Sequence, residues 1–183
     1  MLPEELRTER LRLRRWQASD REPFAELNGD SVVMEFFPAT LTSKESGEMV
    51  DRIEQTFEER GFGLWAVELV ANRSFVGFVG LWPAIFKAEF TPATEIGWRL
   101  ARRHWGHGYA LEAARAVLSD GFDRLGLAEI VSFTAILNQR SRRVMERLGM
   151  RHDDREDFDH PNLAIGHRLR RHALYRLSRG RAP

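Results

Sequence analysis

Apolar residues alternate with polar ones, or form short runs between turn residues, in the segments that we expect to be strands. The first is the leucine–arginine alternation of residues 10–14. The others cover residues 64–69, 75–81, 94–100, 130–137 and 173–177. Residues 64–69 and 75–81 are close enough to form a hairpin. Gly77 and Gly80 in its second strand indicate a bulge or a close approach of two backbones. Residues 83–92 are expected to be a loop.

Apolar residues at helical spacing predict four helices. Ser19 and Glu22 form a potential capping box at the start of the first. Thr42 and Glu45 form another at the start of the second, which Gly61 is suited to end. The remaining two cover residues 110–125 and 140–148, each followed by a glycine. The resulting order, β-α-α-β-β-β-α-β-α-β-β, predicts a mixed α/β domain whose helices pack on one layer of sheet.

Composition narrows the class of protein. The 183 residues fit one domain, and 43% hydrophobic with 30% charged residues is typical of a globular chain with a buried core. Lys and Arg number 28 against 27 Asp and Glu, so a uniformly basic nucleic-acid-binding protein is not expected. The absence of cysteine excludes disulfides, thiolate metal sites and a cysteine nucleophile. No signal segment or membrane-spanning run is evident, so we expect a cytoplasmic protein without membrane contact.

The segment most informative about function lies between the strand that ends near Leu100 and the helix that begins near Ala110. It contains Arg103-x-x-Gly106-x-Gly108. Glycines allow positive φ and let a ligand approach the backbone. Loop N–H groups and a helix N-terminus that face one point form an anion site, for which phosphates are natural ligands. Taken alone, the pattern is explained about equally well by a plain glycine turn into a helix.

Further motifs accompany this loop. Residues 95–100 read Glu-Ile-Gly-Trp-Arg-Leu, residues 106–113 read Gly-His-Gly-Tyr-Ala-Leu-Glu-Ala, and residues 146–150 read Glu-Arg-Leu-Gly-Met, preceded by Asn138 and Ser141. Together with the opening strand they resemble the GNAT superfamily of N-acetyltransferases, in particular the branch of ribosomal-protein N-terminal acetyltransferases. The resemblance covers residues 8–178 and implies a single N-acetyltransferase domain.

The resemblance implies a mixed α/β fold with a central, mostly antiparallel sheet that is splayed in the middle and has helices on both faces. The gap opens between the strand that ends at Leu100 and the strand that ends near Leu137. It holds the pantetheine arm of acetyl-CoA, the implied cosubstrate, as if it were an added strand. The residues implied at the cofactor are Trp98, Arg99, Leu100, Arg103, Gly106, His107, Gly108, Tyr109, Ala110, Asn138 and Ser141.

The implied reaction is direct attack of a primary amine on the acetyl thioester. The amine must lose a proton, and Glu95 beside the acetyl site is our candidate base, directly or through water. A solvent-facing carboxylate at a strand end explains Glu95 equally well. A backbone N–H near Trp98 is the candidate donor to the oxyanion. Ser141 is the second catalytic candidate, on the side of the leaving thiolate; capping or cofactor contact also explains it.

One position departs from the superfamily's pattern. Many members place a tyrosine on the helix after the asparagine to protonate the thiolate, and Met145 stands there in this chain. Water or another group then supplies the proton, or the thiolate leaves unassisted. Tyr109 lies at the cofactor loop. Tyr175, on the last expected strand, faces either the core or the site.

Other polar clusters have plainer explanations. His104 and His107 lie on a loop without a carboxylate cluster, and residues 152–160 are expected to be a solvated loop, so we expect no metal site. The basic segment 167–172 either protects a strand edge or binds an acidic partner such as a ribosomal surface. Trp82, in the expected loop, is a candidate for lining an acceptor pocket.

The sequence therefore predicts an N-acetyltransferase acting on a protein N-terminal α-amine or a small-molecule amine. The alternative is a catalytically impaired acyl-CoA-binding module of the same fold, which Met145 leaves open. A dinucleotide-binding Rossmann site requires a third glycine or alanine where Leu111 stands. No direct contact with nucleic acid is expected. The acceptor and the oligomeric state, a homodimer included, are left open.

Overall fold

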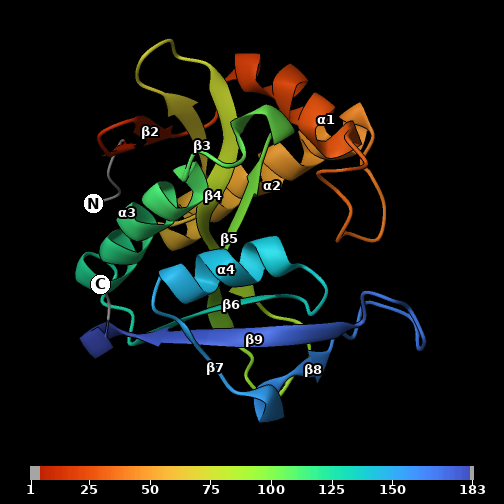
Figure 1. Cartoon of the computed structure of the whole chain (residues 1–183). Coiled ribbons are helices and arrows are strands. Elements are labelled where there is room, and N and C mark those ends of the chain that lie inside the picture. Colours follow the sequence, from red (N-terminus) through yellow and green to blue (C-terminus); the bar gives the residue numbers. More distant parts are fainter. Residues whose placement is uncertain (1–4, 182–183) are drawn as a thin grey trace.

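The structure, a computed structural model, describes residues 5–181. Within them nine strands form one sheet in the order β1-β2-β3-β4-β5-β6-β9-β7, and β8 also pairs with β9 (Figure 1). All paired neighbours are antiparallel except β5 and β6. The strands are β1 (Glu5–Arg7), β2 (Leu11–Arg14), β3 (Leu64–Leu69), β4 (Phe75–Ala84), β5 (Ala93–Leu100), β6 (Glu129–Ala135), β7 (Arg151–His152), β8 (Phe158–Asp159) and β9 (Arg171–Ser178).

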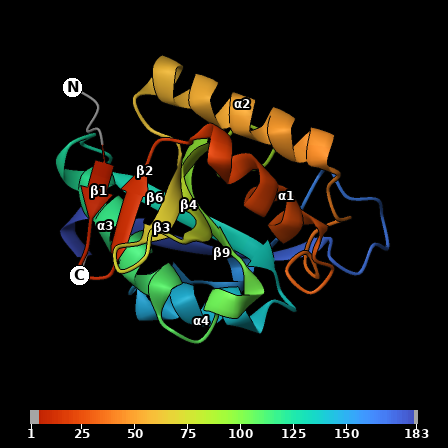
Figure 2. The same cartoon turned by 90° about the horizontal axis from the view of Figure 1, so that it is seen from above.

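Helices cover both faces of the sheet. Seen from above, α1 (Arg21–Gly29) and α2 (Ser43–Arg60) lie on one face, while α3 (Tyr109–Asp123) and α4 (Gln139–Arg147) lie on the other (Figure 2). Large buried side chains fill the space between helices and sheet, among them Phe24, Phe57, Trp65 and Phe122. The expected mixed α/β fold with a mostly antiparallel sheet is confirmed. No helix within residues 5–181 has the length and apolar character to cross a membrane.

The second helix begins and ends as its sequence predicts. The Thr42 hydroxyl accepts the N–H of Glu45 at 3.2 Å, and the Glu45 carboxylate accepts the N–H of Thr42 at 2.7 Å. Gly61 follows the last turn with φ 71°, a conformation that glycine adopts without strain.

The first helix begins differently from the prediction. Ser19 is not its cap; Gln17 and Asp20 instead form a reciprocal capping pair around a 3-10 turn. The Asp20 carboxylate accepts the N–H of Gln17 at 2.8 Å and also binds Arg14 on β2. The ion pair with Arg14, six residues away, holds the Asp20 carboxylate in this turn.

The hairpin of β3 and β4 is confirmed, and its two glycines permit close packing of backbones. A Cβ on Gly77, whose φ is 145°, would lie 2.2 Å from the carbonyl oxygen of Arg99. A Cβ on Gly80 would lie 2.2 Å from the carbonyl oxygen of Gly63. The register also shifts opposite Gly77, as expected for a bulge.

Several segments differ from their expected state. β4 runs through Ala84, so the expectation that the loop begins at Pro83 was wrong, and Trp82 lies in a strand opposite Glu95. The acidic segment 152–160 contains residues of β7 and β8, both paired with β9, rather than only a loop. These strands are two residues long, too short to leave a periodic signal in the sequence. The same holds for β1, which was not predicted.

The sheet opens between β5 and β6, as expected. These parallel strands pair only at Glu95 and Val131, whereas β4 and β5 pair at eight positions. The Ser132 hydroxyl donates to the carbonyl of Ile96 at 2.9 Å and closes the base of the opening. β6 ends at Ala135, two residues earlier than predicted, because the chain turns there into α4.

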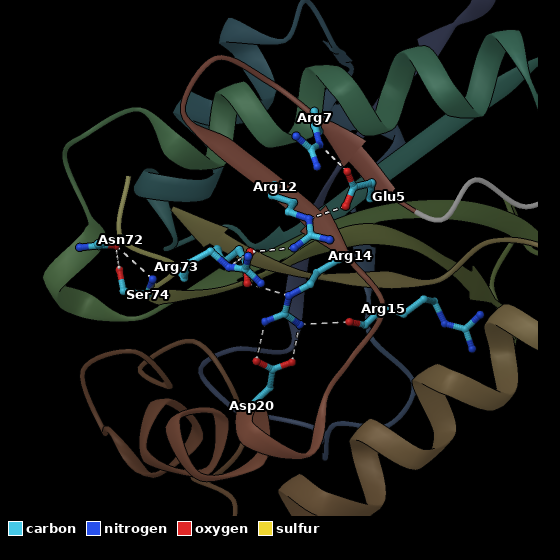
Figure 3. Close-up of polar contacts among 10 residues, drawn as sticks. Glu5, Arg7, Arg12, Arg14, Arg15, Asp20, Asn72, Arg73 and Ser74 are labelled. Carbon is cyan, nitrogen blue, oxygen red and sulfur yellow. Dashed lines mark hydrogen bonds and ion pairs between the residues drawn. The ribbon is translucent and has the colours of Figure 1, made fainter. Parts of the chain in front are cut away.

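A buried ion cluster ties β2 to β3 and to the start of α1 (Figure 3). Arg14, 6% exposed, donates to both carboxylate oxygens of Asp20 at 2.7 and 2.9 Å and to Glu68 at 2.7 Å. Arg12 and Arg73 also pair with Glu68. The two carboxylates neutralise a guanidinium that would otherwise be buried without a partner.

We expect Asp20→Ala to lower the free energy of unfolding by about 3 kcal/mol, because the variant leaves Arg14 partly unpaired in the interior. Urea denaturation followed by circular dichroism measures this loss. Asp51→Ala is the matched control, since Asp51 pairs with Arg21 where both side chains are exposed; its cost should stay within about 1 kcal/mol. Equal losses of unfolding free energy in the two variants would contradict the role of Asp20 as the partner of the buried Arg14.

Candidate functional site

A cavity of about 880 Å³ lies at the opening of the sheet. It is bordered by β4, β5 and β6, by the first turn of α3, by α4, and by α2 with the loop that precedes it. Nine of the eleven residues expected at the cofactor border it: Trp98, Arg99, Leu100, Gly106, Gly108, Tyr109, Ala110, Asn138 and Ser141.

The other two expected residues lie outside this lining. The Arg103 guanidinium donates to the carbonyl of Phe75 at 3.4 Å, and the His107 ring stacks on Tyr109 with centroids 5.4 Å apart. Their backbones remain part of the glycine loop.

The glycine loop leads into α3 with two left-handed residues. Gly106 has φ 80° and Gly108, the N-cap residue of α3, has φ 81°. A Cβ on Gly106 would have no protein atom within 4 Å, so the space beside it is open. The first N–H groups of a helix have no intrahelical partner, and here they border the cavity. This geometry suits an anionic group.

The backbone of β5 presents unpaired groups to the opening. The Ala101 N–H donates to the carbonyl of Val76 on β4. The backbone N–H and C=O groups of the odd-numbered residues of β5 therefore point toward β4. The carbonyl of Ile96 accepts a hydrogen bond from the hydroxyl of Ser132 on β6. The backbone N–H and C=O groups of the even-numbered residues therefore point toward the opening. Because the direction alternates along a strand, the N–H and C=O of Trp98 point into the gap beyond the last β5–β6 pair.

Asn138 and Ser141 form a local pair at the N-terminus of α4. Asn138 Oδ1 accepts the Ser141 N–H at 3.2 Å, and this bond fixes the orientation of the amide. Asn138 Nδ2 therefore donates to Ser141 Oγ, also at 3.2 Å. Since Ser141 Oγ accepts this bond, its own proton is free to be donated toward the cavity.

Met145 and Tyr175 have structural positions. Met145 is 2% exposed and belongs to the core, although it borders the cavity from α4. Tyr175 is buried on the side of α4, where its hydroxyl donates to Glu146 at 3.1 Å and accepts from Arg142 at 3.2 Å. Of the two positions that the sequence left open for Tyr175, the structure shows the core.

Glu95 borders the cavity from β5, with its carboxyl group beside Gly97. Surrounding protein removes water from this group, and desolvation raises the pKa of Glu95 from 4.5 to about 8. Glu95 faces the cavity, and its side chain is partly exposed there. A carboxyl group with a pKa close to neutrality exchanges a proton readily with a bound amine.

Comparison with known proteins now bears on this geometry. The sequence profile of the acetyltransferase (GNAT) domain matches residues 10–151. The chain belongs to the GNAT family of acetyltransferases. The Bacillus subtilis protein YkkB is 34% identical over 144 residues, which are 78% of this chain and 83% of YkkB. Members of this family transfer acetyl groups to amines and use acetyl-CoA.

Solved structures of acetyltransferases share the fold of this chain. A GNAT acetyltransferase from Bacillus anthracis has a TM-score of 0.78 at 26% identity, covering 96% of this chain and 99% of that one. The ribosomal L7/L12 α-N-protein acetyltransferase RimL, solved with coenzyme A, has a TM-score of 0.75 at 16% identity, with 97% of both chains covered. The second likeness is one of fold alone.

Sequence reasoning missed one wall of this GNAT cavity. Phe36, Phe37 and Pro38 lie between α1 and α2 and border it, and their apolar run without helical spacing was an available signal. Trp82 also borders the cavity, as expected. At the other end an aromatic cluster brings together segments distant in sequence: Phe86, Phe90, Phe133, Phe158, His160 and His172.

The basic segment 167–172 is mostly paired within the protein. Arg168 donates to the carbonyl of Glu35 at 2.8 Å, and Arg170 and Arg171 pair with Asp159. Burial lowers the pKa of His172 to about 4, so its ring is neutral at pH 7. Outside the cavity lining, His152, Asp154 and Asp157 bring potential ligand atoms within 4.8 Å of one another.

We expect Glu95→Gln to stabilise this GNAT protein at pH 8 but not at pH 5. Folded Glu95 keeps its proton up to about pH 8, whereas an ordinary glutamate loses it near 4.5, so the stability that the proton provides is lost as pH rises through that range. Thermal melts should show a rise of a few degrees for the variant at pH 8. Glu89→Gln, at an exposed position, is the control; a rise of equal size at both pH values would contradict a desolvated, neutral Glu95 carboxyl group.

Proposed function

We propose that this protein transfers the acetyl group of acetyl-CoA directly to a primary amine, within one domain that covers residues 8–178. The observation that carries the proposal is the position of Trp98 and Glu95 at the opening of the sheet. An unpaired backbone N–H and a carboxyl group of raised pKa lie there on neighbouring parts of one strand. An acyl-CoA-binding module without activity would not need to keep either group.

The cofactor lies along the opening in this proposal. Its pyrophosphate binds the N–H groups between Gly106 and Ala110, where open space and positive φ angles favour it. Its pantetheine arm pairs with the C=O and N–H of Trp98 as an added strand would. Arg140, Arg143 and Arg147 of α4 border the same cavity and provide positive charge for an anionic cofactor.

We assign one group of the protein to each step of the transfer. Ionised Glu95 accepts a proton from the nitrogen of the unprotonated acceptor amine as that nitrogen attacks the thioester carbonyl carbon, so the amide forms without a charge on nitrogen. The Trp98 N–H donates to the oxyanion that forms. As the carbon–sulfur bond breaks, the Ser141 hydroxyl donates a hydrogen bond to the departing thiolate. Met145 packs beside this path without taking part.

Among amines, the pKa of Glu95 favours an α-amine. A base of pKa about 8 matches an α-amino group, which titrates near 7.7–8.0, better than a lysine side chain, which titrates near 10.4. The sequence resemblance to ribosomal-protein N-terminal acetyltransferases and the fold shared with RimL support a protein N-terminus as acceptor. A small molecule that carries an α-amine is the second candidate, because a cavity of about 880 Å³ has room for one beside the cofactor.

Binding tests the cofactor site. Acetyl-CoA should raise the melting temperature of the wild-type protein, and Gly108→Val should remove the rise because its side chain intrudes on the phosphate site. Gly126→Val is the matched control, since Gly126 is also left-handed, with φ 68°, and lies at the far end of α3. If the folded Gly108→Val protein binds acetyl-CoA as the wild type does, the loop is not the phosphate site.

Turnover tests the base. With a panel of peptide and small-molecule amines, Glu95→Gln should lower kcat by about 10²–10⁴-fold and leave the affinity for acetyl-CoA unchanged. Expressed per unprotonated amine, the wild-type kcat/KM should rise with pH to a plateau above about 8, as Glu95 ionises. The variant should lose this rise and Glu89→Gln should keep it. A wild-type profile that is flat through pH 8 would reject Glu95 as the base.

A further inference from the structure

Arg99 is a buried cation without a counter-ion. Its residue is 9% exposed, and no carboxylate of residues 5–181 pairs with it. Nη1 donates to Asn28 Oδ1 at 2.6 Å, and Nε is a buried atom with no hydrogen-bond partner among the described residues. Burial lowers the pKa of Arg99 to about 10, which still leaves it charged at neutral pH.

Structural need does not account for this charge. Arg14, similarly buried, has the carboxylates of both Asp20 and Glu68. Arg99 instead has the rings of Phe37 and Phe78 at 4.1 and 5.3 Å from its guanidinium carbon. Such rings favour a cation but do not neutralise it. A buried charge without a partner is costly to the fold, so a group that neutralises Arg99 from outside the protein is the missing element.

The guanidinium keeps free the edge that best binds a carboxylate. Asn28 occupies Nη1, which leaves Nε and Nη2 side by side. The same edge binds carboxylates elsewhere in this protein: Nε and Nη2 of Arg124 both donate to Asp120 at 2.6 Å, and the same two atoms of Arg155 donate to Asp153. Two parallel bonds of this kind give geometric specificity as well as affinity.

Arg99 borders the cavity on the same face of β5 as Glu95. Side chains alternate along a strand, so Glu95, Gly97 and Arg99 share the face that α1 and α2 cover. A Cβ on Gly97 would meet only Glu95 Oε1, at 3.9 Å, so the space between the two charged residues is open. The spacing of a strand puts their Cα atoms about 13 Å apart, which accommodates a small molecule or one peptide residue.

The charge of the cavity lining points in the same direction. Glu95 is its one carboxylate, and Arg52 and Arg99 remain as positive charges besides the three arginines of α4 that face the cofactor in the proposed function. A bound polycation would be repelled by these charges. An acceptor with one amine and at least one carboxylate fits them.

We propose that Arg99 binds a carboxylate of the acceptor, and that the substrate class is an amine with a carboxylate a few bonds away, rather than a polyamine or another polycationic amine. The carboxylate belongs either to a free amino acid or to an acidic first residue of a peptide. The inference rests on the proposed acetyl transfer and assigns the Arg99 side chain to the acceptor rather than to the cofactor.

Matched acceptors test the inference. Peptides that begin with Glu are compared with the same peptides that begin with Gln, and free amino acids are compared with their amides. We expect the acidic member of the preferred pair to have about a 10–100-fold higher kcat/KM, the size of a charge-assisted hydrogen bond. A preference within the peptide pair identifies the side-chain carboxylate, and one within the amino-acid pair identifies the α-carboxylate. Equal kcat/KM within both pairs would overturn the proposal.

Variants of Arg99 locate the preference. Arg99→Gln should abolish the preference for the acidic acceptor by raising its KM, with the KM for acetyl-CoA unchanged. Arg99→Lys should restore part of the preference. Arg155→Gln, an exposed position with the same change, should behave as the wild type. Equal losses for acidic and neutral acceptors, or a raised KM for acetyl-CoA in Arg99→Gln, would overturn the assignment.

A binding measurement separates this inference from the proposed function. Calorimetric titration of the CoA-loaded protein with glutamate, glutamine and the two peptides requires no turnover. Tighter binding of an acidic ligand that Arg99→Gln removes would support the carboxylate site even if no amine is acetylated. Acetylation of amines without any such preference would support the proposed function and refute the role of Arg99. Melting curves of both variants show that each is folded.

Discussion

The single residue pair between β5 and β6 is the constraint on which the site depends. Glu95 and Val131 meet there, and the bond from Ser132 to Ile96 closes the base of the opening. Beyond this point the strands part, which leaves the backbone of Trp98 without a strand partner and opens the cavity. A continuous sheet would satisfy these backbone groups and leave no room for a ligand.

Two charged residues that border the cavity are desolvated at a cost in folding stability, and the rest of the fold offsets that cost. Glu95 and Arg99 are on one face of β5, and desolvation acts against the charge of both. Toward the β1 edge of the sheet, the buried Arg14 is paired with the carboxylates of Asp20 and Glu68. The contrast is between a buried arginine that is paired within the protein and charged residues at the cavity that have no ion-pair partner among residues 5–181.

Membership of the GNAT family gives this division a chemical meaning. The glycine loop and α4 border the cavity on one side with backbone N–H groups and arginines, which suits an anionic cofactor. The loop after α1 and the aromatic cluster border it on the other side. Glu35 connects the two sides, because it pairs with Arg140 of α4 and its carbonyl accepts Arg168. The α1–α2 side of the cavity is formed by residues outside the GNAT motifs of the sequence.

The sequence by itself determined the features that depend on neighbouring residues. The capping box of Thr42, the left-handed Gly61 and the glycine loop before α3 follow from local conformational preferences, which act over a few residues. Only the tertiary structure decided what depends on distant partners. Asp20, paired with Arg14, rather than Ser19 holds the turn before α1, β7 and β8 exist because β9 pairs with them, and burial alone moves the pKa of Glu95. Arg99 lacks a counter-ion because no segment of residues 5–181 brings a carboxylate to it, a fact that no local pattern contains.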